Sequence, residues 1–152
     1  MNGTGGLTAG PYDALVLEHA RAPAYQTPLP AVDAAADGHD ALCGDHIRIM
    51  LALRDGRITG YAFDADACAI TLAAASMLGD RLQGRCRDEV ARLLRAFDAV
   101  LEGRDESSDA LGPLAAFADL AKHPSRRPCA RLPLTTALKA LDGVPSIDGR
   151  EP

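Results

Sequence analysis

Residues 43–63 read CGDHIRIMLALRDGRITGYAF and contain two patterned segments around a turn. Between His46 and Leu53 every second residue is isoleucine or leucine, which predicts a strand with one buried face. Asp55-Gly56 supplies the residues that a tight hairpin turn needs, and Ile58–Phe63 is expected to return as the second strand. The stretch therefore predicts an antiparallel β-hairpin.

Helix-favouring segments lie on both sides of the predicted hairpin. The clearest is Arg87–Glu102, where apolar residues recur at helical spacing, acidic residues occupy the first turn and Gly103 provides the stop. Cys68–Leu78 is rich in Ala, Leu and Met and favours a helix with its cysteine at the N-terminal end. Further helices are expected at Pro11–Arg21, Pro113–Lys122 and Leu132–Leu141.

Prolines and polar residues mark the predicted connections. Ala22–Asp40 contains three prolines and few large apolar residues, so an irregular loop is expected there. Arg104–Asp109 is expected to be a polar turn. Pro124 and Pro128 are expected to bracket an extended approach to Cys129, because a residue before proline disfavours the helical conformation.

Together these segments predict one α+β domain over residues 11–143. Its architecture is expected to be a small antiparallel β-sheet of about three strands packed against about five helices. Residues 1–10 and 144–152 are expected to be flexible tails. Only 4% of the residues are aromatic and tryptophan is absent, so the core must be built mostly from Ala, Leu, Ile and Val.

The charge balance excludes two classes of partner. A net charge of −5 and a pI near 5.3 offer no dense basic patch for nucleic acid or for an anionic membrane surface. The first ten residues lack the features of a secretory signal, and no run of 18 apolar residues occurs, so we expect a cytoplasmic protein. Its four cysteines would then be reduced thiols, which suits metal binding or sulfur chemistry.

Three of the cysteines fall at the boundaries of predicted elements: Cys43 before a strand, Cys68 at a helix start and Cys129 before the last helix. A helix N-terminus lowers the pKa of a thiol, and Arg126-Arg127 would add positive charge beside Cys129. Asp45 would lie on the same strand face as Cys43.

Three thiolates and one carboxylate fit zinc, and the thiolates also fit an iron-sulfur cluster. The spacing alone does not decide the matter, because the chain has no CxxC or HxxxH pair. The alternatives are that the cysteines are small buried hydrophobic residues and that Asp45 is a solvated strand-end carboxylate.

The cysteine motifs resemble a known family. Cys43-Gly44-Asp45, Ala67-Cys68-Ala69-Ile70-Thr71 and Pro124-Ser125-Arg126-Arg127-Pro128-Cys129-Ala130 are similar to the three motifs of IscU/SufU/NifU-type iron-sulfur cluster assembly proteins, and Leu17-Glu18-His19 is similar to an N-terminal element of that family. The resemblance covers roughly residues 12–141. It is closest to the SufU branch, because an insertion-like stretch precedes Cys129 and the histidine that IscU-type members carry beside that cysteine is absent. Pro128 stands there, where SufU-type members often carry a basic residue, so the usual side chain of both branches is missing.

The resemblance implies a function and a site. SufU-type proteins hold zinc with three cysteines and one aspartate and accept persulfide sulfur from a cysteine desulfurase, whereas IscU-type proteins assemble a cluster. Our leading hypothesis is a zinc-dependent sulfur acceptor with Cys43 as acceptor and Cys43, Asp45, Cys68 and Cys129 as metal ligands. Its expected partners are a SufS-like cysteine desulfurase and downstream cluster assembly proteins. The alternatives are a scaffold that carries a transient iron-sulfur cluster and a zinc-stapled adaptor without sulfur transfer.

The remaining candidates are assigned no place in the site. Cys86 matches no ligand position of the family and is expected to be a bystander near a helix cap. Arg126 is expected either to steady an anionic sulfur species or to make a surface ion pair. None of the four histidines is included as a ligand; they are His19, which is expected to be structural, His39, His46 and His123.

Overall fold

The computed structural model describes residues 14–104 and 111–144. Within these residues the chain forms one three-stranded sheet, four α-helices and two 3-10 helices. The elements in chain order are α2 (Ala14–Arg21), β1 (Ala34–Asp40), β2 (Asp45–Arg54), β3 (Arg57–Asp66), α3 (Ala69–Leu82), α4 (Arg87–Leu101), η1 (Gly112–Lys122), η2 (Pro124–Arg126) and α5 (Arg127–Asp142). None of the helices in the described part of the chain is long and apolar enough to cross a membrane.

The predicted hairpin is confirmed. Strands β2 and β3 pair antiparallel, and the two residues between them, Asp55 and Gly56, both have positive φ, 54° and 78°. Positive φ at both central residues is the requirement of the hairpin turn whose twist matches that of the strands. The inward residues Ile47, Ile49 and Leu51 have no exposed surface. The alternation in the sequence therefore does mark the buried face of β2.

The irregular loop predicted over Ala22–Asp40 is wrong in its last part, because Ala34–Asp40 forms β1. This strand pairs antiparallel with β2 along its full length, and the sheet order is β1-β2-β3. Its alanines, aspartates and glycine have low β propensity, so the local sequence gives no strand signal. Pairing with β2 and packing on α5 override that weak preference.

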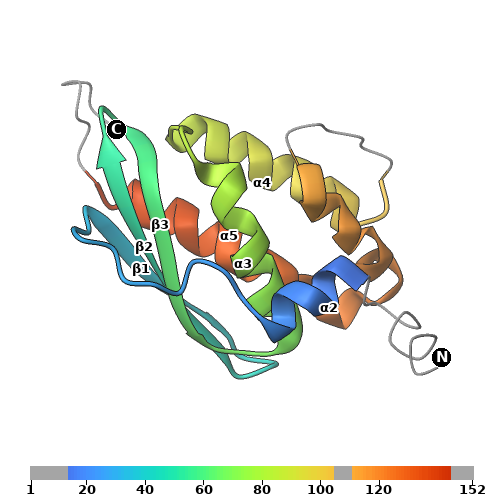
Figure 1. Cartoon of the computed structure of the whole chain (residues 1–152). Helices are drawn as coiled ribbons and strands as arrows, with labels where there is room; N and C mark the ends of the chain where they lie inside the picture. Colours follow the sequence, from blue (N-terminus) through green and yellow to red (C-terminus); the bar gives the residue numbers. More distant parts are fainter. Residues whose placement is uncertain (1–13, 105–110, 145–152) are drawn as a thin grey trace.

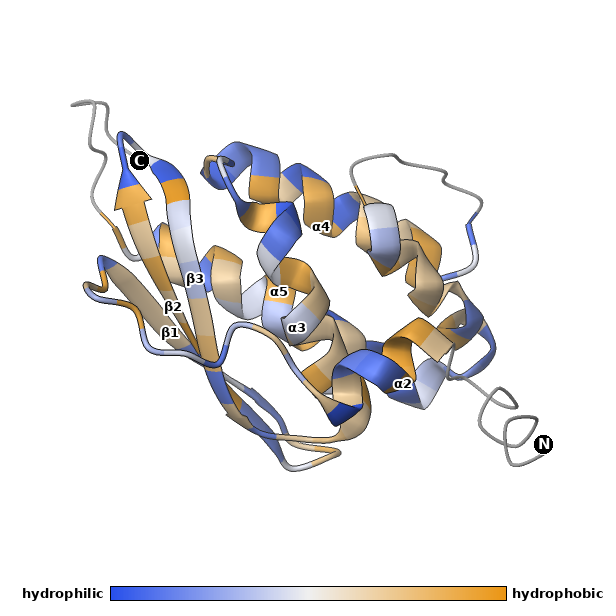
Figure 2. Ribbon diagram, viewed as in Figure 1, coloured by the Kyte–Doolittle hydropathy of each residue, from blue (hydrophilic) through white to orange (hydrophobic). Residues whose placement is uncertain are grey.

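The helices cover one face of the sheet (Figure 1). Helix α5 packs on β1 and β2, and α3 packs on β3. Helix α2 packs on α3, while α4 and η1 pack on each other behind α5 and α3. Figure 2 shows apolar residues gathered where these helices face the sheet and each other. The predicted α+β class and the predicted helices at α3, α4 and η1 are confirmed, although η1 has 3-10 geometry.

The extended approach predicted for Pro124–Pro128 is wrong. A 3-10 turn at η2 leads directly into α5, which begins at Arg127, so Cys129 lies in the first turn of the helix. Proline is tolerated in a first turn because the N–H that it lacks has no helical partner there. The helix also contains Pro133 in its interior.

Four of the predicted features fall wholly or partly outside the described residues. They are the two tails, most of the Arg104–Asp109 turn, and the first residues of the Pro11–Arg21 helix, of which Ala14–Arg21 is observed as α2.

The first prediction concerns the close contact between β1 and α5. A Cβ atom added at Gly38 would lie 2.0 Å from Oγ1 of the buried Thr136, so Gly38→Ala must push the strand and the helix apart. Overpacking of this kind costs about 1–3 kcal/mol, which lowers Tm by roughly 2–4 °C per kcal/mol in a chain of this size. Thermal unfolding measures it. Gly143→Ala is the control, because its nearest neighbour would be 3.6 Å away; equal Tm values for the two variants would contradict the packing.

Candidate metal centre

Three segments that are distant in sequence meet at one end of the sheet. The first is the β1–β2 turn, residues 41–44, the second is the N-terminus of α3, and the third is the first turn of α5. The turn contributes Cys43, α3 is preceded by Cys68 as its N-cap residue, and α5 contributes Cys129. The predicted position of Cys68 is therefore confirmed.

The two sulfur atoms of Cys43 and Cys129 lie 3.0 Å apart although 86 residues separate them in the chain. The two thiols differ in exposure, since Cys43 is exposed and Cys129 is fully buried. Cys68 is half-buried, and its Sγ lies 3.5 Å from Oγ1 of Thr71. One thiol is thus accessible to a partner while another anchors the site from the interior.

The Cys129 thiol does not have the lowered pKa that its helix position predicts. Burial raises the pKa of Cys129, and the neighbouring thiols of Cys43 and Cys68 raise it further. Neither arginine is seen to bond the thiol: Arg126 is exposed, and Arg127 donates its hydrogen bonds to the backbone carbonyls of residues 120 and 121. A buried group of thiols favours the protonated form, so a cation is needed to stabilise the thiolate.

Asp45 is a buried carboxylate with a defined set of partners. It is 3% exposed, which excludes the alternative of a solvated strand-end carboxylate. Its Oδ1 accepts a hydrogen bond of 2.8 Å from the backbone N–H of Cys68, and its Oδ2 accepts one of 2.6 Å from the hydroxyl of Thr71. The carboxylate therefore caps the N-terminus of α3, where free N–H groups and the helix dipole favour negative charge.

Thr71 links this carboxylate to α5. Its Oγ1 also lies 3.1 Å from the backbone carbonyl oxygen of Cys129. That carbonyl cannot accept the usual helical hydrogen bond, because the residue four positions later is Pro133, which has no N–H. The one proton of the Thr71 hydroxyl is directed at Asp45 over the shorter distance, so its approach to the Cys129 carbonyl is a polar contact between α3 and α5. Sequence reasoning named Thr71 only as part of a motif and missed this role.

Asp40 is a further candidate that sequence reasoning missed. The ligand atoms of Asp40, Cys43, Asp45 and Cys129 all lie within 4.8 Å of one another, and this group does not include the sulfur of Cys68. The spacing D-x-x-C-x-D could have indicated two carboxylates around Cys43, but only if 34–40 had been recognised as a strand. The structure thus brings together three of the four proposed ligands, with Cys68 close enough to influence Cys129.

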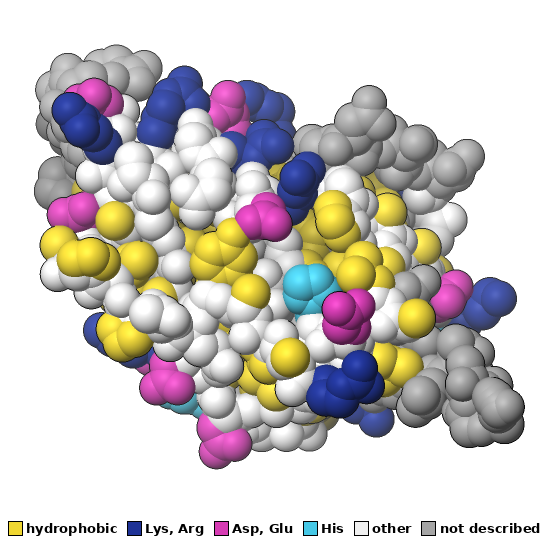
Figure 3. Space-filling view, viewed as in Figure 1, with side chains coloured by type: hydrophobic (Ala, Val, Ile, Leu, Met, Phe, Trp, Pro, Cys, Tyr) yellow, Lys and Arg dark blue, Asp and Glu magenta, His cyan; other side chains and the backbone are white. Residues whose placement is uncertain are grey.

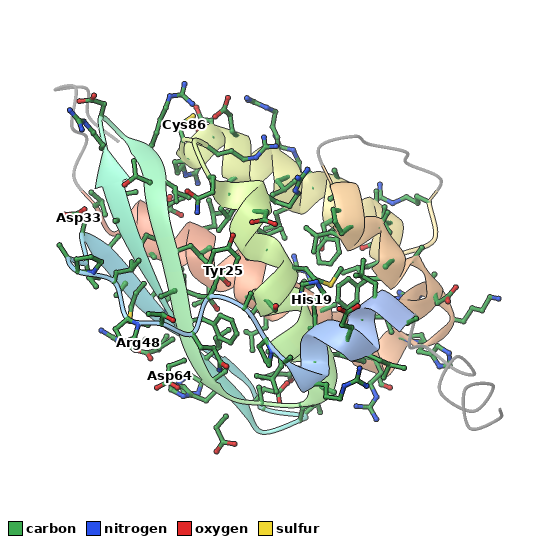
Figure 4. The ribbon with its side chains drawn as sticks, viewed as in Figure 1. His19, Tyr25, Asp33, Arg48, Asp64 and Cys86 are labelled. Atoms are coloured by element: carbon green, nitrogen blue, oxygen red, sulfur yellow. The ribbon has the colours of Figure 1, made fainter. Side chains whose placement is uncertain are left out.

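Cys86 lies at the other end of the sheet from this group. It is the N-cap residue of α4 and forms a bridge with Arg57, the first residue of β3, whereas His46, the neighbour of Asp45, pairs with Asp66, the last residue of that strand. Ten residues of strand place the two ends about 30 Å apart. Figure 4 shows Cys86 beside the hairpin end of the sheet. It belongs to no described group of candidate ligands.

The histidines lie outside the candidate metal group within the described residues. His46 projects from the solvent-facing side of β2, where its Nε2 lies 3.2 Å from Asp37 and its ring stacks on His39. His19 is labelled in Figure 4, on the face that Figure 3 shows in space-filling form, and its Nδ1 lies 2.7 Å from the hydroxyl of Ser76. This contact ties α2 to α3, in agreement with the expected structural role of His19.

The sequence and the fold agree on the family of the chain. Residues 11–130 match the family described as NifU-like N terminal domain. The chain is 30% identical to the zinc-dependent sulfurtransferase SufU of Bacillus subtilis (strain 168) over 116 residues, which cover 74% of this chain and 76% of that protein. It is 29% identical to the iron-sulfur cluster assembly scaffold protein IscU of Streptococcus pyogenes serotype M1 over 122 residues, covering 80% and 76%.

Solved structures show the same fold. The N-terminal part of a nitrogen-fixing NifU-like protein from Brucella abortus superimposes with a TM-score of 0.80 at 24% identity, covering 88% of this chain and 94% of that one. FiSufU from Fervidobacterium islandicum AW-1 superimposes with a TM-score of 0.79 at 21% identity, covering 86% and 96%. The chain belongs to the NifU-like N-terminal domain family. The family resemblance of its cysteine motifs is confirmed.

The second prediction tests the contact between Thr71 and Asp45. Thr71→Val keeps the shape of the side chain but leaves a buried carboxylate oxygen without its donor, so the free energy of unfolding should fall by about 1–3 kcal/mol. Urea unfolding of the metal-free, reduced protein measures it. Thr135→Val is the control, because that half-buried hydroxyl bonds only within its own helix, and a change within about 0.5 kcal/mol is expected. Equal losses in the two variants would contradict the proposed importance of the contact.

Proposed function

We propose that this chain acts in iron-sulfur cluster assembly as a zinc-holding acceptor of persulfide sulfur, with Cys43 as the accepting residue. The observation that carries the proposal is the single group formed by an exposed thiol, a buried thiol and a buried carboxylate, contributed by Cys43, Cys129 and Asp45. Membership of the NifU-like N-terminal domain family supports it, as does the similarity to a protein named zinc-dependent sulfurtransferase.

The donor set fits zinc. Thiolate sulfur and carboxylate oxygen are both zinc ligands, and four such donors complete a tetrahedral structural site. We propose Cys43, Asp45, Cys68 and Cys129 as these four. A bound zinc ion would supply the positive charge that keeps buried thiols ionised. The raised pKa of Cys129 supports this assignment, because that thiol needs such a charge nearby to lose its proton.

Cys43 is suited to accept sulfur because it is exposed in a turn. In the proposed step its thiolate attacks the terminal sulfur of a persulfide on a cysteine desulfurase. A new sulfur–sulfur bond forms on Cys43, the sulfur–sulfur bond of the donor breaks, and the donor cysteine leaves as a thiolate that takes up a proton. Leu42, which is 84% exposed, places an apolar side chain beside Cys43 for contact with such a partner.

A scaffold on which a cluster is assembled is the second candidate function. The same thiols can ligate iron, and the chain is similar to a protein named as an IscU scaffold. The absence of histidine beside Cys129, where Pro128 stands, favours the acceptor. In a zinc-stapled adaptor, the third candidate, Cys43 would transfer no sulfur.

The third prediction tests the acceptor directly. Cys43→Ser, Cys68→Ser and Cys129→Ser should each reduce desulfurase-dependent sulfide release to the level seen without the protein, because each removes a proposed ligand. Cys86→Ser is the matched control and should leave the activity intact, since Cys86 lies at the other end of the sheet. The assay uses a SufS-like desulfurase, cysteine and a reductant, and mass spectrometry locates the added sulfur. Loss of activity in Cys86→Ser equal to that of the other three variants would show that the site is wrong.

The fourth prediction separates the acceptor from the scaffold. The wild type should carry about one zinc per chain, and Asp45→Ala should lose it and unfold at a lower temperature. Asp45 also accepts hydrogen bonds from Cys68 and Thr71, so part of the loss of thermal stability should remain when a chelator has removed the metal. Thermal unfolding is therefore measured with and without the chelator.

The same variant is reconstituted with iron and sulfide, and the lifetime of its cluster is followed by visible absorption. Zinc content unchanged from wild type, together with a longer-lived cluster, would favour the scaffold over the acceptor. Asp64→Ala is the control, because that carboxylate is exposed on β3 and is not part of the group (Figure 4).

A further inference from the structure

Asp40 faces Asp45 across the β1–β2 turn, since the two residues are register partners at the ends of their strands. Four residues, 41–44, close the turn, which is held by a 2.8 Å hydrogen bond from the N–H of Gly44 to the carbonyl of Asp40. Gly44 has a φ of +72°, a conformation that glycine adopts without strain. The turn therefore places Cys43 between two carboxylates.

The two oxygens of the Asp40 carboxylate have different neighbours. Oδ1 accepts a 3.0 Å hydrogen bond from the N–H of Leu42, which stabilises the turn. Oδ2 lies 3.8 Å from the sulfur of Cys129, and this is its one hydrogen-bonding contact among the described residues. One oxygen is thus used by the fold, and the other is directed at the candidate metal group.

The site therefore has more donors than zinc needs. The proposed ligands Cys43, Asp45, Cys68 and Cys129 fill four tetrahedral positions, and Asp40 is a fifth donor within 4.8 Å of three of them. Asp45 is held by α3, and Cys129 is buried in α5. Cys43 is exposed, so among these donors it is the one that can leave without disturbing the core.

We propose that Asp40 is a reserve ligand, which takes the coordination position of Cys43 when that thiol is engaged in sulfur transfer. This inference rests on the proposed zinc site. Asp40 would keep the metal bound to Asp45, Cys68 and Cys129 while Cys43 carries sulfur, and Cys43 would return to the metal after passing the sulfur on. The exchange is of one anionic ligand for another, so the total charge of the four metal ligands would be unchanged.

The experiment measures zinc affinity in four proteins: wild type, Asp40→Asn, Cys43→Ala and the double variant. Asp40→Asn keeps an oxygen that can accept from Leu42, so the turn is retained while the negative charge is lost. Cys43→Ala removes the thiol without adding an oxygen ligand. Zinc affinity is determined by competition with a chromophoric chelator. The conditions are reducing, because the Cys43 and Cys129 sulfurs are 3.0 Å apart and could otherwise be oxidised to a disulfide.

A reserve ligand should matter only when Cys43 is absent. Asp40→Asn should weaken zinc binding by less than about threefold in the wild-type background and by about tenfold or more in the Cys43→Ala background. Cobalt substituted into Cys43→Ala should show an absorption change on the further Asp40→Asn replacement. Asp64→Asn, which removes an exposed carboxylate of β3, is the charge control and should change the affinity by less than about threefold in either background.

Each outcome bears on one of the two proposals. Equal zinc affinities for Cys43→Ala and the double variant would overturn the role of Asp40 while leaving the zinc site intact. Failure of the wild type to bind zinc would overturn both proposals. If Cys43→Ala does not fold, Cys43 is instead alkylated in the folded Cys86→Ser protein, both with and without Asp40→Asn. A tenfold weaker zinc affinity in the alkylated protein that carries Asp40→Asn supports the proposal. Equal zinc affinities of the two alkylated proteins reject it.

Discussion

The buried carboxylate of Asp45 is the interaction on which the candidate site depends. It begins β2, yet its two oxygens accept hydrogen bonds from the N-terminus of α3, through the Cys68 N–H and the Thr71 hydroxyl. A carboxylate at 3% exposure is stable only with such donors, so strand and helix are held in one relative position. The Thr71 hydroxyl also lies 3.1 Å from the Cys129 carbonyl, to which Pro133 cannot donate, so it contacts α5 as well. One small polar network thus joins the sheet to both helices that cover it.

This network explains the division of roles among the thiols. Cys129 is buried in a helix and burial raises its pKa, so its thiol would ionise only with a cation nearby, as in the metal-anchoring role that we propose. Cys43 lies in an exposed turn between two carboxylates, where it can be reached by another protein without opening the core. Burial and exposure therefore suit Cys129 and Cys43 to the two different roles that we propose for them, holding a metal and accepting sulfur.

Local sequence patterns were sufficient wherever the chain interacts mainly with its neighbours. The alternation of Ile47, Ile49 and Leu51 and the Asp55-Gly56 pair predicted the hairpin, because strand period and turn geometry are local properties. The prediction failed for Ala34–Asp40, whose residues have low β propensity and become a strand only by pairing with β2. It also failed at Pro128, because proline in a first helical turn is allowed and the sequence does not show where that turn begins.

The sequence by itself determined the class of the protein: its cysteine motifs carried the family resemblance, and its periodicities carried the hairpin and the helix at α4. It also named Cys43, Asp45, Cys68 and Cys129 as candidate ligands. Only the tertiary structure decided which donors approach one another, because Cys43 and Cys129 are 86 residues apart and no local rule brings them to 3.0 Å. It likewise placed Asp40 in the group and raised the pKa of Cys129, since both effects arise from the packing of β1 and α5 around the site.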